Sequence, residues 1–245
     1  MTDKTPSDDT PTVVLVHGAF VDGSSWAGVI AELKAADVDV IAPPNMLRGI
    51  GADAAYLTGL VNALDRPVVL VGHSYGGAVI TQAGADANRV VGLVYVAAFA
   101  PEEGEPLVEI NSRYPDVPLA AALRTFNYAT EAGEESTDTF VDRDLFRDAV
   151  CADVPEDLAD LLARTQRPAS LNCFGSVVTG TPAWKFVPSW AVVATADRAI
   201  DPVAVRDMAV RAGSEISEVD ASHAVAGSQP AAVAEVIMRA VKGTP

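Results

Sequence analysis

The residues with the clearest chemical potential form the motif Gly72-His73-Ser74-Tyr75-Gly76-Gly77. The motif follows an apolar run at residues 68–71 and opens a helix-like run at Ala78, and in that context G-x-S-x-G predicts a nucleophilic serine at a sharp strand-to-helix turn. Glycines suit such a turn because its backbone is strained and approaches its neighbours closely. A serine hydroxyl also needs a base and a group that orients the base. The motif therefore predicts that Ser74 is a nucleophile with two partners elsewhere in the chain.

Histidine is the side chain best suited to act as the base, and the chain has three histidines. His17 lies in the loop after the first apolar run. His73 is inside the serine motif, where its side chain is expected to point away from the reactive side of its neighbour. His223 stands alone just after the last expected strand, at the end of a strand where open α/β sheets bind their ligands. We therefore predict that His223 is the base.

Two aspartates just past an expected strand, Asp197 and Asp201, are candidates for the acid that orients the base. Asp201 precedes Pro202, and an aspartate before a proline at a helix start is most simply an N-cap. We therefore assign the acid to Asp197. The order along the chain is then Ser74, Asp197 and His223, which is the order expected for an α/β-hydrolase.

A tetrahedral intermediate also needs N–H donors for its negative oxygen. The residue after the nucleophile, Tyr75, is expected to supply one backbone amide. The loop His17-Gly18-Ala19-Phe20, directly after the first strand, is expected to supply the other. We predict an oxyanion hole made by the amides of Ala19 and Tyr75, with Phe20 as an alternative to Ala19.

The elements that must position these residues are read from alternating apolar and helical patterns. Strands are expected at residues 12–16, 38–42, 67–72, 90–98, 189–195 and 215–219. Helices are expected at residues 24–36, 51–64, 76–87, 202–212 and 230–241. Continuous β-branched and aliphatic runs are typical of strands buried on both faces of a parallel sheet. The alternation predicts an α/β fold with a doubly wound, mostly parallel sheet.

The alternation stops between Pro101 and about Lys185, where no strand-like run is apparent. Residues 142–149 and 155–165 have apolar side chains at helical spacing, so a small helical cap is expected over one edge of the sheet. The expected organisation has three parts. Residues 1–11 are a disordered leader, residues 12–100 and 186–245 together form the core, and residues 101–185 form the cap. The aromatic residues of the cap are candidates either for pocket walls or for core packing: Phe126, Tyr128, Phe140, Phe146 and Trp184.

Composition and charge disfavour some classes of binding partner. Of 245 residues, 17 are Lys or Arg and 33 are Asp or Glu, so the formal charge is 17 − 33 = −16, and 49% of residues are hydrophobic. Such a chain can bury a sizeable core. Its charge disfavours nucleic acids and anionic membranes as partners. No stretch reaches the roughly 18 apolar residues of a membrane span.

Cofactor and metal motifs are not apparent in the sequence. Two cysteines, Cys151 and Cys173, are too few for a disulfide framework and lie in no metal-binding pattern, which fits a cytoplasmic protein. No phosphate-binding or dinucleotide-binding glycine motif occurs, so neither an organic cofactor nor a metal is implied. Asp37, Asp39 and Asp53 are interpreted as solvated charges.

With these residues in place, the chain resembles the α/β-hydrolase superfamily, and within it the branch of plant methyl-ester esterases and hydroxynitrile lyases with their bacterial esterase-like relatives. The resemblance runs nearly the whole length. The oxyanion loop that carries it is His17-Gly18-Ala19 with Gly23 and Trp26, and the turn with the nucleophile is residues 72–77. Two segments resemble the cap, at residues 155–158 and 167–171. The acid and base loops are residues 196–200 and 222–223. It implies a helical cap inserted after the sixth strand of the family's fold.

The resemblance also implies a reaction. Hydroxynitrile lyases of this branch place a lysine directly after the histidine, and Ala224 stands there, which disfavours lyase activity. Haloalkane dehalogenases and epoxide hydrolases of the superfamily have an aspartate at the nucleophile position, where this chain has Ser74, so both of these activities are excluded. The expected function is hydrolysis of a small carboxylic ester through an acyl-enzyme, with that ester as the partner and a homo-oligomer left open. The alternatives are a cofactor-free perhydrolase, a small-molecule receptor on the same fold, and a lyase, including one that cleaves carbon–carbon bonds.

Overall fold

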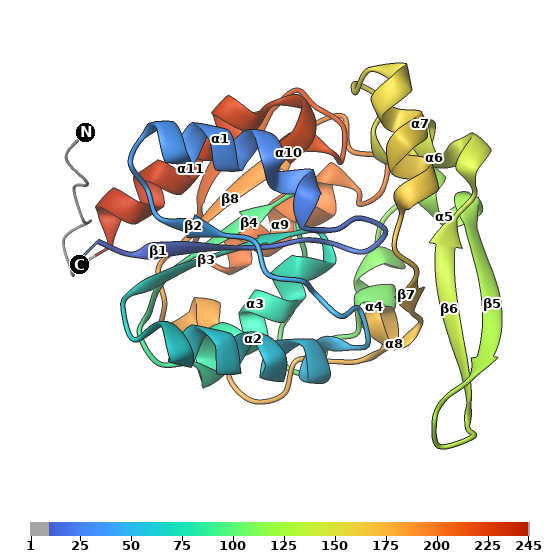
Figure 1. Ribbon diagram of the computed structural model, residues 1–245, viewed down its shortest axis with the longest axis horizontal. Coiled ribbons are helices and arrows are strands. Elements are labelled where there is room, and N and C mark those ends of the chain that lie inside the picture. The colour runs from blue at the N-terminus through green and yellow to red at the C-terminus, as the bar shows by residue number, and fades with distance from the viewer. Residues whose placement is uncertain (1–9, 245) are drawn as a thin grey trace.

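A computed structural model describes residues 10–244 of the chain, so residues 1–9 of the expected leader lie outside the described residues. Six strands form one sheet, and every pairing in it is parallel. The strands are β1 (Thr12–Val16), β2 (Val40–Ile41), β3 (Val68–His73), β4 (Val90–Val96), β8 (Ser189–Ala194) and β9 (Glu215–Val219). Their order across the sheet is β2-β1-β3-β4-β8-β9. The expected doubly wound parallel sheet is confirmed (Figure 1).

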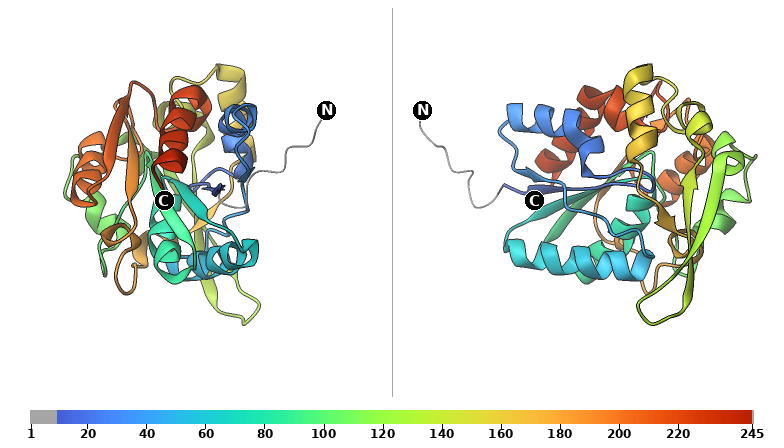
Figure 2. Two further views of the ribbon diagram at one scale, coloured as in Figure 1. Left: turned by 90° about the vertical axis from the view of Figure 1, so that its left-hand side faces the viewer. Right: turned by 45° about the vertical axis from the view of Figure 1, so that its right-hand side comes forward.

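Helices cover both faces of this sheet, as Figure 2 shows from two further sides. One face carries α1 (Ala27–Ala35), α10 (Val225–Ser228) and α11 (Pro230–Gly243), and a 3₁₀ turn at Gly23–Trp26 leads into α1. The other face carries α2 (Ile50–Leu64), α3 (Tyr75–Asp86) and α9 (Pro202–Arg211). Alternate residues of one strand enter the two cores. Val13 and Leu15 of β1 belong to the first core, whereas Val14 and Val16 belong to the second. Burial on both faces explains why the strands read as continuous apolar runs.

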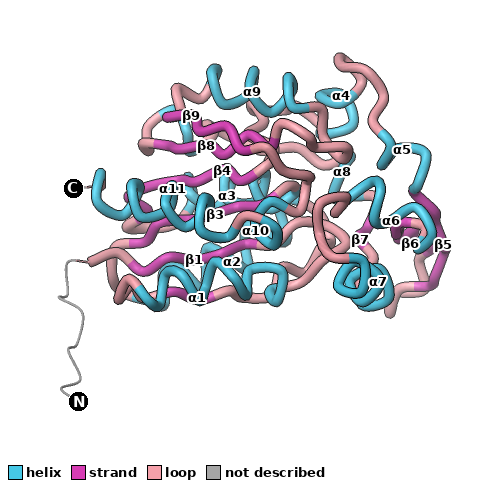
Figure 3. The backbone as a smooth tube through the Cα atoms, turned by 90° about the horizontal axis from the view of Figure 1, so that it is seen from above, coloured by secondary structure: helices cyan, strands magenta, loops and turns pink. Residues whose placement is uncertain are grey.

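The chain leaves the sheet after β4 and returns at β8, and we call residues 97–188 the insertion. Counted along this chain, the insertion follows the fourth of the six strands. It contains α4 (Leu107–Asn111), α5 (Pro118–Ala122), β5 (Leu123–Ala129), β6 (Glu135–Val141), α6 (Arg143–Val150), α7 (Glu156–Thr165), β7 (Ala169–Ser170), α8 (Asn172–Gly175) and a 3₁₀ turn at Ala183–Lys185. The helices expected at residues 142–149 and 155–165 are α6 and α7. Seen from above, α4 to α7 with β5 and β6 lie beyond the carboxyl ends of the strands (Figure 3), whereas the last residues of the insertion return to the start of β8.

The expectation that the insertion lacks strands is wrong, because β5 and β6 form an antiparallel hairpin that β7 joins. This hairpin projects from the body of the molecule (Figure 1). Most of β5 is exposed, so the hairpin is built from polar, β-branched and aromatic residues rather than from an apolar run. The search for buried strands therefore missed it. Gly133, with a φ of 80°, lies in the turn between the two strands.

No helix within residues 10–244 combines the length and the apolar character that crossing a membrane requires.

Candidate active site

Ser74 lies at a strained turn between β3 and α3, which we call the elbow (residues 72–77). Its φ of 54° and ψ of −122° fall in a region that residues with a Cβ rarely adopt. The glycines around it leave no space for a side chain. A Cβ on Gly72 would lie 2.5 Å from the oxygen of Gly76, and a Cβ on Gly76 would lie 2.4 Å from the oxygen of Val16. The close approach of strand, turn and helix therefore requires glycine at these positions.

Asp197 and His223 follow β8 and β9, and because these strands are parallel neighbours, the two residues lie at the same edge of the sheet. Nδ1 of His223 is 2.7 Å from Oδ2 of Asp197. The other carboxylate oxygen accepts hydrogen bonds from the amides of Ala199, at 2.7 Å, and Ile200, at 3.0 Å. Both side chains are buried. The carboxylate is thus fixed on one side and holds the Nδ1 proton of the imidazole on the other, which directs Nε2 to accept a proton.

Asp201 is an N-cap, as its place before a proline predicted. Its side chain accepts a hydrogen bond from the amide of Val203 at 2.7 Å, at the start of α9. Asp201 therefore stabilises a helix end rather than the imidazole of His223.

The other two histidines are buried and structural. Nε2 of His17 accepts a hydrogen bond from the amide of Asn45 at 3.0 Å, and its Nδ1 donates to the oxygen of Gly18 at 2.9 Å. His73 donates from Nε2 to the oxygen of His223 at 2.9 Å. Burial lowers the pKa of His17, and burial together with the nearby His223 lowers the pKa of His73 to about 3. Both rings are therefore neutral near pH 7, and His73 fixes the loop that carries His223.

The loop after β1 lies directly against the elbow. A Cβ on Gly18 would lie only 2.7 Å from the Cβ of Ser74. Ala19 and Phe20 line the same cavity as Ser74 and His223, and Phe20 has a left-handed backbone with a φ of 65°. Both residues proposed for the second amide of the oxyanion hole are thus at the cavity, and Tyr75 follows Ser74 at the start of α3.

Three cavities meet at this edge of the sheet. The central cavity, of about 40 Å³, is lined by residues that include Ser74, His223, Ala19, Phe20, His73 and Phe174. The large cavity, of about 530 Å³, is lined by residues that include Phe20, Asn111, Leu119, Leu123, Leu171 and Phe174. The small cavity, of about 190 Å³, is lined by residues that include Val21, His73, Phe146, Val150, Leu162 and Ala224. The walls of the large and small cavities are mostly apolar.

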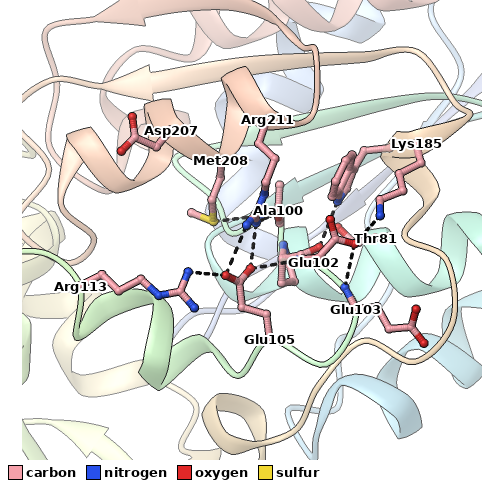
Figure 4. Close-up of polar contacts among 12 residues, drawn as sticks. Thr81, Ala100, Glu102, Glu103, Glu105, Arg113, Lys185, Asp207, Met208 and Arg211 are labelled. Carbon is pink, nitrogen blue, oxygen red and sulfur yellow. Dashed lines mark hydrogen bonds and ion pairs between the residues drawn. The ribbon is translucent and has the colours of Figure 1, made fainter.

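An ion-pair cluster fixes the start of the insertion, as Figure 4 shows. Glu105 accepts hydrogen bonds from Arg113 at 2.5 Å and from Arg211 of α9 at 2.8 Å, and Arg211 also donates to the oxygen of Ala100. Burial alone would raise the pKa of Glu105, but the bonds from the two guanidinium groups lower it to about 2. The cluster thereby ties α4, whose Asn111 lines two of the cavities, to the helix beside β8.

Neither cysteine competes with Ser74 as a nucleophile. Cys151 and Cys173 are buried free thiols. Burial raises the pKa of Cys151 to about 11 and that of Cys173 to about 12, so both remain protonated near neutral pH. Within the part of the chain that the structure describes, no group of three or more His, Cys, Asp or Glu side chains is arranged to hold a metal ion.

The model of the Alpha/beta hydrolase family matches residues 13–236, which is most of the chain. The chain belongs to the α/β-hydrolase family. It is 36% identical over 113 residues to a carbendazim-hydrolysing esterase from Nocardioides sp. (strain SG-4G), and this match spans 40% of the chain but less than half, 46%, of that relative.

Solved structures share the fold over nearly the whole chain. Polyneuridine aldehyde esterase superposes with a TM-score of 0.80 at 18% identity and covers 94% of this α/β-hydrolase and 98% of its own chain. A pyrethroid hydrolase from Sphingobium faniae gives 0.77 at 20% identity, with 95% and 97% covered. A methylesterase from Arabidopsis gives 0.76 at 20% identity, with 95% and 99% covered. The expected resemblance to this superfamily is confirmed, and at these identities the superpositions show a common fold.

Asp53 is a residue that the sequence interpretation assigned wrongly. It is not a solvated charge but is buried in the first turn of α2, where it accepts hydrogen bonds from the amide of Arg48 and, at 2.6 Å, from the hydroxyl of Tyr75. The available signal was its position near a helix start, where carboxylates bond to free amides. Its bond to Tyr75 depends on a tertiary contact that spacing cannot show. Asp53 thereby anchors the residue that follows Ser74.

Two of the five aromatic candidates of the cap are buried, and the other three lie on the hairpin, where they are neither buried nor at a cavity. Phe146 lines the small cavity. Trp184 is buried and donates to the oxygen of Pro101 at 3.0 Å. On the hairpin, the ring of Phe126 contacts those of Tyr128 and Phe140, with centroids 6.3 and 6.1 Å apart, and none of the three side chains lines the three cavities.

Proposed function

We propose that this α/β-hydrolase cleaves a neutral carboxylic ester of a small molecule through an acyl-enzyme, with Ser74 as nucleophile, His223 as base and Asp197 as the orienting acid. One observation carries the proposal. A serine held in a strained turn shares a cavity with a histidine whose Nδ1 is bonded to a buried carboxylate. This combination matches the requirements for activating a hydroxyl group.

In the first half-reaction, Nε2 of His223 takes the hydroxyl proton while Oγ of Ser74 attacks the ester carbonyl carbon. The carbonyl oxygen becomes negative and is stabilised by the amides of Tyr75 and of Ala19 or Phe20. The imidazolium then gives its proton to the alcohol oxygen, the carbon–oxygen bond breaks, and the alcohol leaves. The acyl group remains on Oγ.

In the second half-reaction, His223 takes a proton from water, and the hydroxide attacks the acyl carbon. The proton passes to Oγ of Ser74 as the bond to the acyl group breaks, so the carboxylic acid leaves and the serine is restored. Asp197 stabilises the imidazolium in both halves. His223 is the histidine suited to this proton cycle because its Nδ1 is bonded to the carboxylate of Asp197, whereas the pKa values of His17 and His73 are lowered.

A neutral, apolar ester suits the site best. The large and small cavities are mostly apolar, and the net charge of −16 repels anionic substrates. The carbendazim-hydrolysing esterase, the pyrethroid hydrolase and the methylesterase are named for hydrolysis of small organic molecules, which supports the same class here.

The test is the initial rate on p-nitrophenyl esters of increasing acyl length, measured on the native protein, on Ser74→Ala and on a matched control, Ser136→Ala, which changes a serine of the hairpin. Hydrolysis should fall by at least about 10³-fold in Ser74→Ala and stay within twofold in Ser136→Ala. A fluorophosphonate probe should add one phosphonyl group to Ser74, detected by mass spectrometry. Equal rates for Ser74→Ala and native protein, or no turnover of any ester by folded native protein, would overturn the proposal.

A further inference from the structure

The large and small cavities share different walls with the central cavity. The small cavity shares Val21, His73 and Val150 with it. The large cavity shares a different set with it, which includes Phe20, Leu119 and Phe174. Because the two sets do not overlap, the cavities approach Ser74 from different sides. An ester whose carbonyl carbon lies at Ser74 can therefore place one of its two groups in each cavity.

The position of the base distinguishes the two groups. The small cavity is lined by Ala224, directly after His223, and by Ala226 and Gly227 of α10. The large cavity is lined by no residue from 221–227. The loop after β1 lines both cavities, with Val21 at the small one and Phe20 at the large one, so it is the loop of the base that distinguishes them. The imidazolium must donate its proton to the alcohol oxygen, so the alcohol leaves on the side of the base.

We propose that the small cavity binds the alcohol group of the substrate and that the large cavity binds its acyl group. This assignment rests on the proposed ester hydrolysis and makes it more specific. It identifies the walls of the small cavity, on α1, α6, α7 and α10, as the residues that select the alcohol.

The chemistry of the small cavity specifies the alcohol. Its walls are mainly aliphatic and aromatic, and its two serines already use their hydroxyl protons: Ser24 donates to a carboxylate oxygen of Asp22 and Ser25 donates to the Asp22 backbone oxygen. The cavity therefore offers few donors to a polar group. A dry cavity of about 150 Å³ holds benzene, so about 190 Å³ holds a benzyl-sized group. The alcohol is expected to be apolar and no larger than a benzyl or short branched alkyl alcohol.

The assignment has a kinetic consequence. The alcohol has left before water attacks the acyl-enzyme, so a change in the small cavity alters acylation and leaves deacylation unchanged. The acyl group is present in both halves, so a change in the large cavity alters both rates. The ratio of the two effects distinguishes the cavities without a structure of a complex.

The experiment compares two half-buried leucines that each line one of the two outer cavities, Leu162 in the small cavity and Leu123 in the large one. Leu162→Trp, Leu123→Trp and native protein are assayed on methyl, benzyl and naphthylmethyl esters of one acyl group. They are then assayed on p-nitrophenyl esters of increasing acyl length. Pre-steady-state bursts with the p-nitrophenyl esters give the deacylation rate. Leu158→Trp and Leu171→Trp, at exposed leucines lining the small and large cavities, repeat the comparison if a buried variant fails to fold.

Leu162→Trp is expected to lower kcat/KM for the benzyl ester relative to the methyl ester by at least tenfold and to leave deacylation within twofold of native. Leu123→Trp is expected to preserve the ratio of benzyl to methyl rates and to shift the acyl-length optimum. Native protein should reject the naphthylmethyl ester. The opposite pattern, with Leu162→Trp changing deacylation and acyl preference, would overturn the assignment while leaving the proposed function intact. If native protein hydrolysed none of the esters, that result would instead contradict the proposed function.

Discussion

The carboxyl edge of the parallel sheet and the insertion contribute differently to the site. The edge carries the three residues to which we assign the chemistry: Ser74 after β3, Asp197 after β8 and His223 after β9. The insertion supplies most walls of the large cavity and much of the small one. Buried backbone contacts fix the edge, whereas the insertion includes a hairpin exposed along most of β5. The difference indicates that the proposed chemistry depends on the rigid edge and that selection of the substrate depends on the insertion.

The largest effect expected at the edge comes from Asp197→Asn. The amide would present an N–H or a weaker acceptor to Nδ1 and would favour the wrong tautomer of His223, so kcat should fall by about 10³- to 10⁴-fold. The matched control is Asp142→Asn at the N-cap of α6, which lines none of the three cavities; asparagine also serves as an N-cap there, and the rate should stay within twofold. Steady-state kinetics on one p-nitrophenyl ester decides the matter, and an equal loss in both variants would place the acid elsewhere.

Packing at the elbow should be far less tolerant than packing in the insertion. Gly76→Ala places a Cβ against the backbone oxygen of Val16, so we expect the free energy of unfolding to fall by about 3 kcal/mol. Gly175→Ala in α8 meets open space, so its stability should change by less than about 1 kcal/mol. Urea unfolding of both variants tests the contrast. Similar stabilities would show that the elbow can relax.

The free energy of unfolding should fall with pH already above the range in which carboxylates become protonated, because two buried histidines lie at the edge. His17 and His73 have lowered pKa values in the folded protein, so the unfolded chain binds more protons below about pH 6.5. Stability should therefore decrease as pH falls from 6.5 toward 4.5, by up to about 1.4 kcal/mol per pH unit for each histidine. Unfolding in urea at pH 7.5, 6.5, 5.5 and 5.0 measures this slope. A flat profile would mean that these rings take up protons as readily in the folded protein as in the unfolded chain.

The smallest effect is expected at the tether of the hairpin. Arg48 donates to both carboxylate oxygens of Asp138, at 2.7 and 2.9 Å, and to the hydroxyl of Tyr128. The Arg48 side chain is 41% exposed but that of Asp138 is only 8% exposed, so Arg48→Ala leaves a mostly buried carboxylate without its partner and should lower the free energy of unfolding by about 1 to 2 kcal/mol. Hydrogen exchange should speed up in β5 and β6 more than in β1 and β3, with esterase rates within twofold. A large loss of activity would show that the hairpin takes part in the site.

The sequence predicted the sheet well because a strand buried on both faces is a continuous apolar run that is easy to recognise. Val13 to Val16 of β1 are all apolar, since alternate residues enter opposite cores. The sequence also placed Asp197 and His223 just after two expected strands, and the structure shows the two side chains hydrogen-bonded. Their catalytic roles and that of Ser74 stay predictions until they are assayed.

What the sequence could not predict depends on contacts between distant segments. The bond from Tyr75 to Asp53 joins two helices, and no local pattern distinguishes a buried carboxylate in a helix's first turn from an exposed one. The cavity walls formed by Phe20, Leu119 and Phe174 come from three separate loops and helices. The hairpin was not expected because β5 is mostly exposed and neither of its strands is a continuous apolar run.

The pairing of β4 with β8 also has a consequence for how the molecule folds. Leu93 pairs with Ser189 across the whole insertion, so the two halves of the sheet join through a contact between segments distant in the sequence. Ser74 belongs to the first half, and Asp197 and His223 belong to the second. Contacts of this kind form slowly, although the entropy of closing a loop rises only gently with its length. The amino-terminal half can therefore collapse during synthesis on the ribosome, while the three residues meet only after the last two strands have been made and docked.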